Sequence, residues 1–112
     1  MTYEVLNTII ASFGLPYAYN EFPENTQQTP PFICFLLDNN SADLMADNTN
    51  YQAIRPLSIE LYTDNKDFAL EMTIEAALNA AGLPFMRSKE TYIEKERMYQ
   101  ITYESEVLIS NA

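Results

Sequence analysis

Apolar residues recur at helical spacing in two stretches of the chain. In the first, an apolar stripe follows Thr2, a residue type that can cap a helix; its members are Val5, Leu6, Ile9, Ile10 and Phe13. The second stretch is expected to begin near Asp64 or Asn65, with Asp67 in its first turn, where a carboxylate favours the positive helix end. Its apolar side consists of Phe68, Leu70, Ile74, Ala77, Leu78 and Ala81. The pattern predicts two amphipathic helices.

The tripeptide Gly-Leu-Pro closes both helical stretches, at residues 14–16 and 82–84. Glycine suits the left-handed conformation that follows the last turn of a helix, and proline prevents the helix from continuing. We therefore expect Gly14 and Gly82 to adopt positive φ at the two helix ends, each followed by a strand. Neither copy fits a phosphate-binding loop, because both lack a second glycine and a suitably placed lysine.

The remaining apolar segments have the patterns of strands. Residues 17–22 form a short candidate, and residues 32–37 are apolar on both faces, as in a strand that is covered from two sides. Residues 57–62 alternate between apolar and polar side chains, which is typical of a strand with one buried face. Residues 85–93 and 97–109 have the pattern of a hairpin.

The order of these segments, α-β-β-β-α-β-β, predicts an α+β fold. In this fold two helices pack on a mostly antiparallel sheet of about five strands. The length of 112 residues is enough for one hydrophobic core, so we expect a single domain over residues 1–112.

A long polar loop, residues 38–50, separates two of the predicted strands. It is rich in Asp, Asn and Ser, yet it contains the adjacent apolar residues Leu44 and Met45. Loops of this length inside a small domain tend to be functional or disordered. We consider Leu44 and Met45 candidates for a protein interface; the alternative is that both fold back onto the domain.

The charge of the chain is strongly negative. Six basic and sixteen acidic residues give a net charge of -10. This balance argues against direct binding to nucleic acid and favours a partner with a basic or neutral surface. No apolar run is long enough to cross a bilayer, and the first residues lack the basic region of a signal peptide. We expect a soluble intracellular protein without a membrane contact.

The residues needed for common catalytic and metal sites are scarce. The chain has no histidine and one cysteine, Cys34, so Ser-His and Cys-His pairs and soft metal sites are excluded. The carboxylates of the long loop lack the glycine and the closing glutamate of a calcium loop. A carboxylate pair for glycoside hydrolysis is not excluded by spacing, but a domain of this size leaves little room for a substrate cleft. We expect no enzyme activity, no metal site and no cofactor.

Arginine and tyrosine residues point to protein contacts. Arg55, Arg87 and Arg97 are few among many carboxylates, so each is expected to pair with one. At a subunit contact such pairs would set orientation, and we select Arg55 and Arg97 as candidate interface residues. The eight tyrosines lie mostly near acidic residues, which favours core and protein-interface roles over stacking on nucleic-acid bases.

Three segments of the chain carry a family resemblance. They read LPYAYNEFPENTQQTPPFICFLLDNNSADLMADN, IELYTDNKD and SKETYIEKERMYQITYESEV. The sequence resembles small prophage-encoded proteins of Firmicutes that are grouped with phage head–tail neck and tail-completion (tail-terminator) proteins. The resemblance spans nearly the whole chain and consists of structural residues, so it supports function by association. It implies a virion component that forms a ring of copies, often a hexamer, which caps the tail tube and joins it to the neck.

The expected function is therefore that of a structural phage protein. It would be made in the cytoplasm of a bacterial host, associate with itself, dock onto the tail tube or a connector protein, and become part of the virion. The alternative is an acidic prophage inhibitor or DNA mimic that binds a basic nucleic-acid enzyme. A ring would close through heterologous contacts, whereas a mimic would act as a monomer or dimer with its acidic residues in a stripe.

Overall fold

The computed structural model describes residues 1–22, 28–38, 52–88 and 90–110, and the candidate interface residues Leu44 and Met45 lie outside these ranges. Within these ranges, two helices and six strands follow one another. In order, they are α1 (Tyr3–Ala11), β1 (Tyr17–Tyr19), β2 (Phe32–Leu37), β3 (Gln52–Thr63), α2 (Phe68–Ala80), β4 (Phe85–Arg87), β5 (Thr91–Ile93) and β6 (Met98–Ser110). The predicted α+β class is confirmed.

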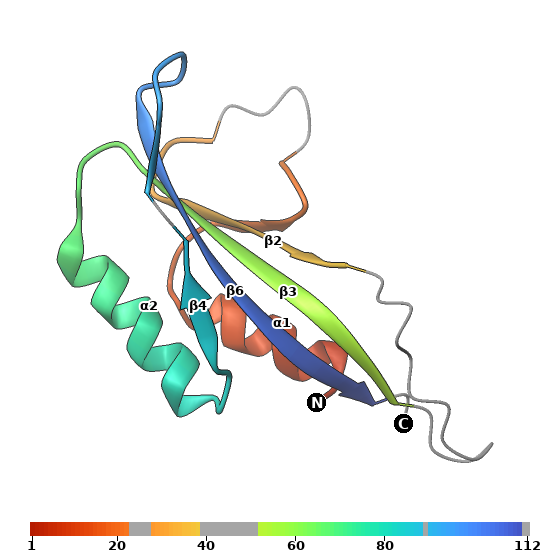
Figure 1. Cartoon of the computed structure of the whole chain (residues 1–112). Coiled ribbons are helices and arrows are strands. Elements are labelled where there is room, and N and C mark those ends of the chain that lie inside the picture. The colour runs from red at the N-terminus through yellow and green to blue at the C-terminus, as the bar shows by residue number, and fades with distance from the viewer. Residues whose placement is uncertain (23–27, 39–51, 89, 111–112) are drawn as a thin grey trace.

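The strands form a mixed sheet in the order β1-β2-β3-β6-β4, and β5 also pairs with β6. Only the pairing of β1 with β2 is parallel among the described strands, so the sheet is mostly antiparallel as predicted. The two longest strands, β3 and β6, lie side by side at its centre (Figure 1). Between β1 and β2 the parallel register begins at Tyr17 and Ile33.

The sheet has six strands where about five were expected, because the predicted strand over residues 85–93 is divided. Arg87 of β4 pairs with Tyr103, whereas Thr91 of β5 pairs with Gln100. Arg87 and Thr91 are thus four residues apart in the sequence, whereas their partners Tyr103 and Gln100 are three residues apart. An extra residue of this kind is a β-bulge and interrupts regular pairing. At the interruption, Ser88 Oγ accepts a hydrogen bond from the Thr102 N–H at 2.9 Å.

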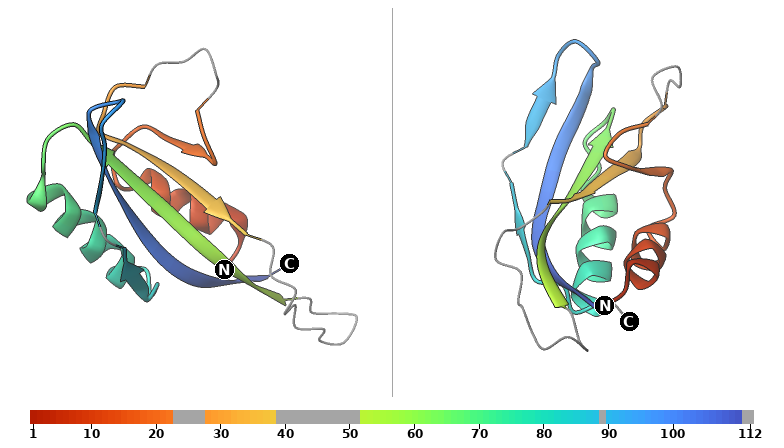
Figure 2. Two further views of the ribbon diagram at one scale, coloured as in Figure 1. Left: turned by 45° about the horizontal axis from the view of Figure 1, so that its top comes forward. Right: turned by 90° about the vertical axis from the view of Figure 1, so that its right-hand side faces the viewer.

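Both helices cover the same face of the sheet, as the two views of Figure 2 show. This face is apolar because alternate residues of β2, β3 and β6 point toward the helices. The resulting core consists of Leu6, Ile10 and Phe13 of α1 and its end, Ile74, Leu78 and Leu83 of α2 and its end, and Ile33, Phe35, Leu37, Leu57, Ile59, Leu61, Ile101, Tyr103, Val107 and Ile109 of the strands.

The opposite face of the sheet, which we call the outer face, carries a second and smaller apolar cluster. Phe32, Cys34 and Met98 are buried there, and Phe22, Tyr62 and Ile93 pack against them. Strand β2 is therefore covered on both faces, as its continuous apolar sequence predicted.

Side-chain caps fix where the helices begin. The Val5 N–H donates to Thr2 Oγ1 at 3.2 Å, which confirms Thr2 as the cap of α1. In α2 the cap is Asp67, whose Oδ1 accepts from the Leu70 N–H at 3.0 Å. The helix therefore begins later than Asp64 or Asn65. The Asp64 carboxylate instead accepts a hydrogen bond from the Asn65 N–H in the turn before the helix.

The two glycines end the helices as predicted. Gly14 has φ 78° and Gly82 has φ 73°, so both occupy the left-handed region. At the end of α2, the Leu83 N–H donates to the Leu78 carbonyl and the Gly82 N–H donates to the Asn79 carbonyl, each at 3.0 Å. This pair of bonds is the Schellman motif, which satisfies carbonyls that the helix leaves without partners. Within the described ranges, neither helix is long and apolar enough to span a membrane.

Candidate functional site

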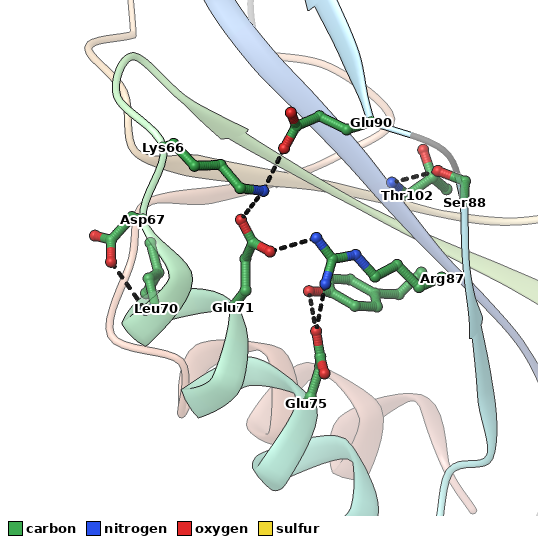
Figure 3. A network of polar contacts seen from close by, with 10 residues as sticks. Lys66, Asp67, Leu70, Glu71, Glu75, Arg87, Ser88, Glu90 and Thr102 are labelled. Atoms are coloured by element: carbon green, nitrogen blue, oxygen red, sulfur yellow. Dashed lines mark hydrogen bonds and ion pairs between the residues drawn. The ribbon is translucent and has the colours of Figure 1, made fainter.

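A buried carboxylate on α2 is the centre of a polar network (Figure 3). Glu71 is 2% exposed. One of its oxygens accepts a hydrogen bond from Arg87 Nη2 at 2.5 Å, and the other accepts from Lys66 Nζ at 2.6 Å. Lys66 also contacts Glu90. A buried charge is tolerated when it is paired and its lone pairs accept hydrogen bonds, and both conditions are met here.

The network continues from Arg87 into the core of the sheet. Glu75 lies 3.5 Å from Arg87 Nη1 and accepts a hydrogen bond from Tyr103 Oη at 2.9 Å. Burial raises the pKa of Tyr103, and the hydrogen bond to Glu75 raises it further, so the phenol stays protonated. The prediction that an arginine pairs with a carboxylate is confirmed for Arg87. These contacts fasten α2 to β4 and β6, which is a structural role.

The sequence offered no catalytic or metal site, and two observations bear on such sites. Among the described residues, no group of three or more acidic or cysteine side chains is arranged to hold a metal ion. The buried thiol of Cys34 has a pKa raised to about 11 by burial and, secondarily, by the charges of Glu60 and Glu21. This thiol is therefore protonated at neutral pH and is a poor nucleophile.

A shallow groove runs between α1 and the β1 edge of the sheet. We call it the α1 groove; it is lined by Tyr3, Leu6, Asn7, Tyr19, Phe35, Leu37 and Arg55. Tyr3 and Tyr19 are 53% and 51% exposed, so they present aromatic surface to solvent. The Tyr19 hydroxyl accepts from the Leu37 N–H at 3.2 Å and donates to the Leu37 carbonyl at 3.1 Å, which holds the ring against β2.

The candidate interface residue Arg55 lies in this groove. Its Nη1 donates to Tyr3 Oη at 2.8 Å, and its Nε and Nη2 donate to the carbonyls of Asp38 and Leu37, both at 3.1 Å. The guanidinium carbon is 5.9 Å from the centre of the Tyr3 ring. The groove thus combines aromatic surface with a positive charge held in a fixed position.

A second exposed apolar surface lies on α2. Phe68 and Met72, one helical turn apart, are 66% and 70% exposed, and we call this pair the α2 patch. The prediction that Phe68 faces the core was wrong. At about 100° per residue, Phe68 points roughly 120° away from Ile74, which faces the sheet. Lys66 Nζ lies 4.8 Å from the centre of the Phe68 ring and so connects the patch to the Glu71 network.

The α1 groove and the α2 patch lie at opposite edges of the domain. The groove includes residues of β1, which is one edge strand of the sheet. Helix α2 is held to β4, the edge strand on the other side, through the contacts of Arg87 with Glu71 and Glu75. In Figure 1, α2 lies to the left of β4 and α1 lies to its right. One chain thus presents two different apolar surfaces in different directions.

Sequence reasoning identified only part of this arrangement. Arg55 was selected, whereas Tyr3, Tyr19 and the α2 patch were not. A signal for the patch was present, because Met72 falls on the polar side of the predicted helix, where an apolar residue has no core to contact. Arg97, the other selected arginine, is exposed in the turn between β5 and β6 and has φ 54°.

Comparison with known proteins adds information about the fold. No protein-family model matches the chain, and no curated protein matches it. Among solved structures, the chain is similar to one from the virion of a native gene transfer agent (GTA) particle. The TM-score is 0.57, with 23% identity over 92% of this chain and 84% of that chain. A second structure, with a TM-score of 0.47 and 16% identity over 89% of this chain and 83% of that chain, is too distant to support an argument. This chain thus shares its fold with a chain of the GTA virion.

Proposed function

We propose that this chain is a structural component of a phage-like virion, a tail terminator or head–tail neck protein that associates with itself into a ring. In this role it docks onto the tail tube or a connector protein. The fold shared with a chain of a GTA virion supports this proposal at the level of architecture. The observation that carries it is the presence of two different exposed apolar surfaces, the α1 groove and the α2 patch, at opposite edges of one domain.

Two unlike surfaces on one chain favour a heterologous contact, in which the patch of one copy meets the groove of the next. Repetition of such a contact closes a ring when the rotation between copies permits it. Exposed apolar surface of this kind marks interaction sites on soluble proteins.

The free energy of one such contact is modest. Burial of Phe68 and Met72 contributes about 1.5–3 kcal/mol for each side chain. Association costs at least as much in lost translational and rotational freedom, about 4–15 kcal/mol, so one such contact leaves no large surplus. We therefore expect weak association of the isolated chain and stronger association when a ring closes or when a tail tube holds several copies together.

The test uses two variants with one matched control each. Met72→Glu blocks the patch, and Thr73→Glu adds the same charge to an exposed position about 100° around the helix. Tyr3→Asp blocks the groove, and Val5→Asp replaces another exposed apolar residue of α1 outside the groove. Sedimentation velocity at high protein concentration should show oligomers for the wild type and for both controls, and monomers for Met72→Glu and Tyr3→Asp.

Mixing the two blocked variants gives the most specific outcome. A heterologous contact leaves one intact groove and one intact patch in the mixture, so a one-to-one dimer should form and grow no further. Oligomers that survive both substitutions would overturn the groove–patch contact. A wild type that stays monomeric at high concentration and in the presence of tail tubes would overturn the ring, and would fit instead an acidic inhibitor of a basic nucleic-acid enzyme.

A further inference from the structure

A pocket on the outer face lies between the β5–β6 hairpin and the chain around residues 20–22 and 28–30, at the end of the sheet seen at the top of Figure 1. We call it the outer pocket. Its floor is the small apolar cluster with Phe32, Cys34 and Met98. Phe32 stacks on Tyr62 with ring centres 4.8 Å apart, and Phe22 meets Phe32 edge-on at 5.4 Å. The interior is therefore apolar and largely aromatic.

Among the described residues, three carboxylates line the outer pocket: Glu21, Glu60 and Glu96. No lysine or arginine occurs among the described residues that line it. Glu60 accepts hydrogen bonds from two neutral groups, Tyr62 Oη at 3.0 Å and Gln100 Nε2 at 3.3 Å. These bonds fix the direction of the carboxylate and leave its negative charge in place.

The negative potential reaches the interior of the pocket. Burial raises the pKa of Tyr62, and the charge of Glu60 and the hydrogen bond to it raise that pKa further. After burial, the charges of Glu60 and Glu21 also raise the pKa of the Cys34 thiol. Two groups on the floor and wall thus resist ionisation partly because the pocket already holds negative charge.

We propose that the outer pocket binds a lysine or arginine side chain of a partner protein. Aromatic faces attract a cation through their quadrupole, and the carboxylates add direct charge pairing. The methylene stem of a long basic side chain is compatible with an apolar floor, since such stems pack on apolar surface while the charged end stays polar. An aromatic, acid-lined pocket therefore matches both parts of this side chain.

The ligand is assigned to a partner and not to a second copy of the chain. The chain has only six basic residues. Lys66 and Arg87 are held by Glu71 and its neighbours, and Arg55 is held in the α1 groove on another part of the domain. Lys95 and Arg97 are exposed in the turn that contains Glu96, so they lie beside the pocket of their own chain. A net charge of -10 further favours a basic partner over a copy. This inference is independent of ring formation and concerns a different surface.

The test is an NMR titration that uses the methionine methyl groups as probes. The protein, labelled at its methionine methyls, is titrated with the capped peptide acetyl-Ala-Arg-Ala-amide and, in parallel, with the same peptide containing uncharged citrulline. The Met98 methyl should shift and saturate at about millimolar arginine peptide, in the affinity range of a single contact. The exposed Met86, which is not part of this lining, should remain unchanged.

Substitutions test whether the charge of Glu60 is responsible for binding of the arginine peptide. Glu60→Gln removes the charge and keeps one acceptor oxygen, which can accept from either Tyr62 Oη or Gln100 Nε2, and it should weaken arginine-peptide binding about two- to fivefold. The matched control, Glu104→Gln, removes a charge of β6 that is not in the pocket lining and should leave binding unchanged. Equal binding of the citrulline peptide, no saturable shift of Met98, or equal binding by the Glu60→Gln variant would each overturn the proposal.

Discussion

Removal of both cations that hold Glu71 should be among the most destabilising changes that this protein can undergo. The variant Lys66→Met/Arg87→Met keeps the aliphatic part of both side chains and leaves the carboxylate without a charged partner. The perturbation therefore isolates the cost of an unpaired buried charge from the loss of packing.

The size of the expected destabilisation depends on which member of each ion pair is buried. The side chain of Glu71 is 3% exposed, whereas those of Lys66 and Arg87 are 24% and 40% exposed. The carboxylate thus bears most of the desolvation cost, and the cations keep much of their hydration. Loss of one cation should cost about 1–2 kcal/mol, because the other remains and solvent screens the pair. Loss of both should cost about 3–4 kcal/mol, close to the value for a broken buried pair.

A third substitution makes the prediction specific. In Lys66→Met/Arg87→Met/Glu71→Met the buried charge is absent, and replacement of a buried ion cluster by apolar residues is often neutral. This triple variant should recover at least half of the lost free energy of unfolding. Urea denaturation followed by circular dichroism measures all three proteins, with Glu90→Gln as a control that should change stability by less than about 0.5 kcal/mol. A triple variant as unstable as the double variant would refute the argument, because the loss would then come from packing.

Three further predictions concern other parts of the chain. Gly14→Ala and Gly82→Ala should each lower the free energy of unfolding by about 1–2 kcal/mol, because both glycines have positive φ. A new Cβ would meet no other part of the structure within 4 Å, so the cost is that of the backbone conformation alone. Unchanged thermal melting of both variants would contradict this prediction. The pKa of Tyr103 is raised in the folded state, so as the pH rises the unfolded chain loses this phenol proton before the folded chain does. Above about pH 10 the free energy of unfolding should therefore fall by up to about 1.4 kcal/mol per pH unit for this group. Urea titrations at several alkaline pH values should show a smaller fall for Tyr103→Phe. Serine at both Leu44 and Met45 should leave monomer melting unchanged and prevent assembly if the two residues form an interface, whereas a large drop in melting temperature with normal assembly would show that they belong to the core.

The elements that depend on local chemistry were predictable from the sequence. Apolar periodicity located both helices, and glycine followed by proline located their ends because few other residues tolerate that backbone. The residue types alone did not locate the start of α2, since Asp64, Asn65 and Asp67 all suit a turn or a helix cap. The hydrogen bond from the Leu70 N–H to Asp67 identifies Asp67 as the cap. The alternation over residues 57–62 predicted a strand with one buried face, and β3 buries Leu57, Ile59 and Leu61 on that face.

Features that depend on distant residues were not predictable. The division of the strand over residues 85–93 reflects the register against β6, which no local pattern encodes. The burial of Glu71 contradicts the usual exposure of glutamate and becomes reasonable only when Lys66 and Arg87 are seen on either side of it. The α1 groove likewise joins α1, β1, β2 and β3, so its residues are scattered along the chain.

The Glu71 network and the α2 patch are connected through Lys66. Lys66 donates to Glu71 and at the same time lies against the ring of Phe68, so the charge that stabilises the buried carboxylate also limits the motion of an exposed aromatic side chain. Arg87 holds the following turn of α2 to β4, which fixes the direction in which Met72 points. A surface that is already ordered loses less conformational freedom when it binds, and more of the free energy of apolar burial remains for association. In the proposed ring contact, the two cations around Glu71 would therefore strengthen binding through the α2 patch by ordering it before a neighbouring copy arrives.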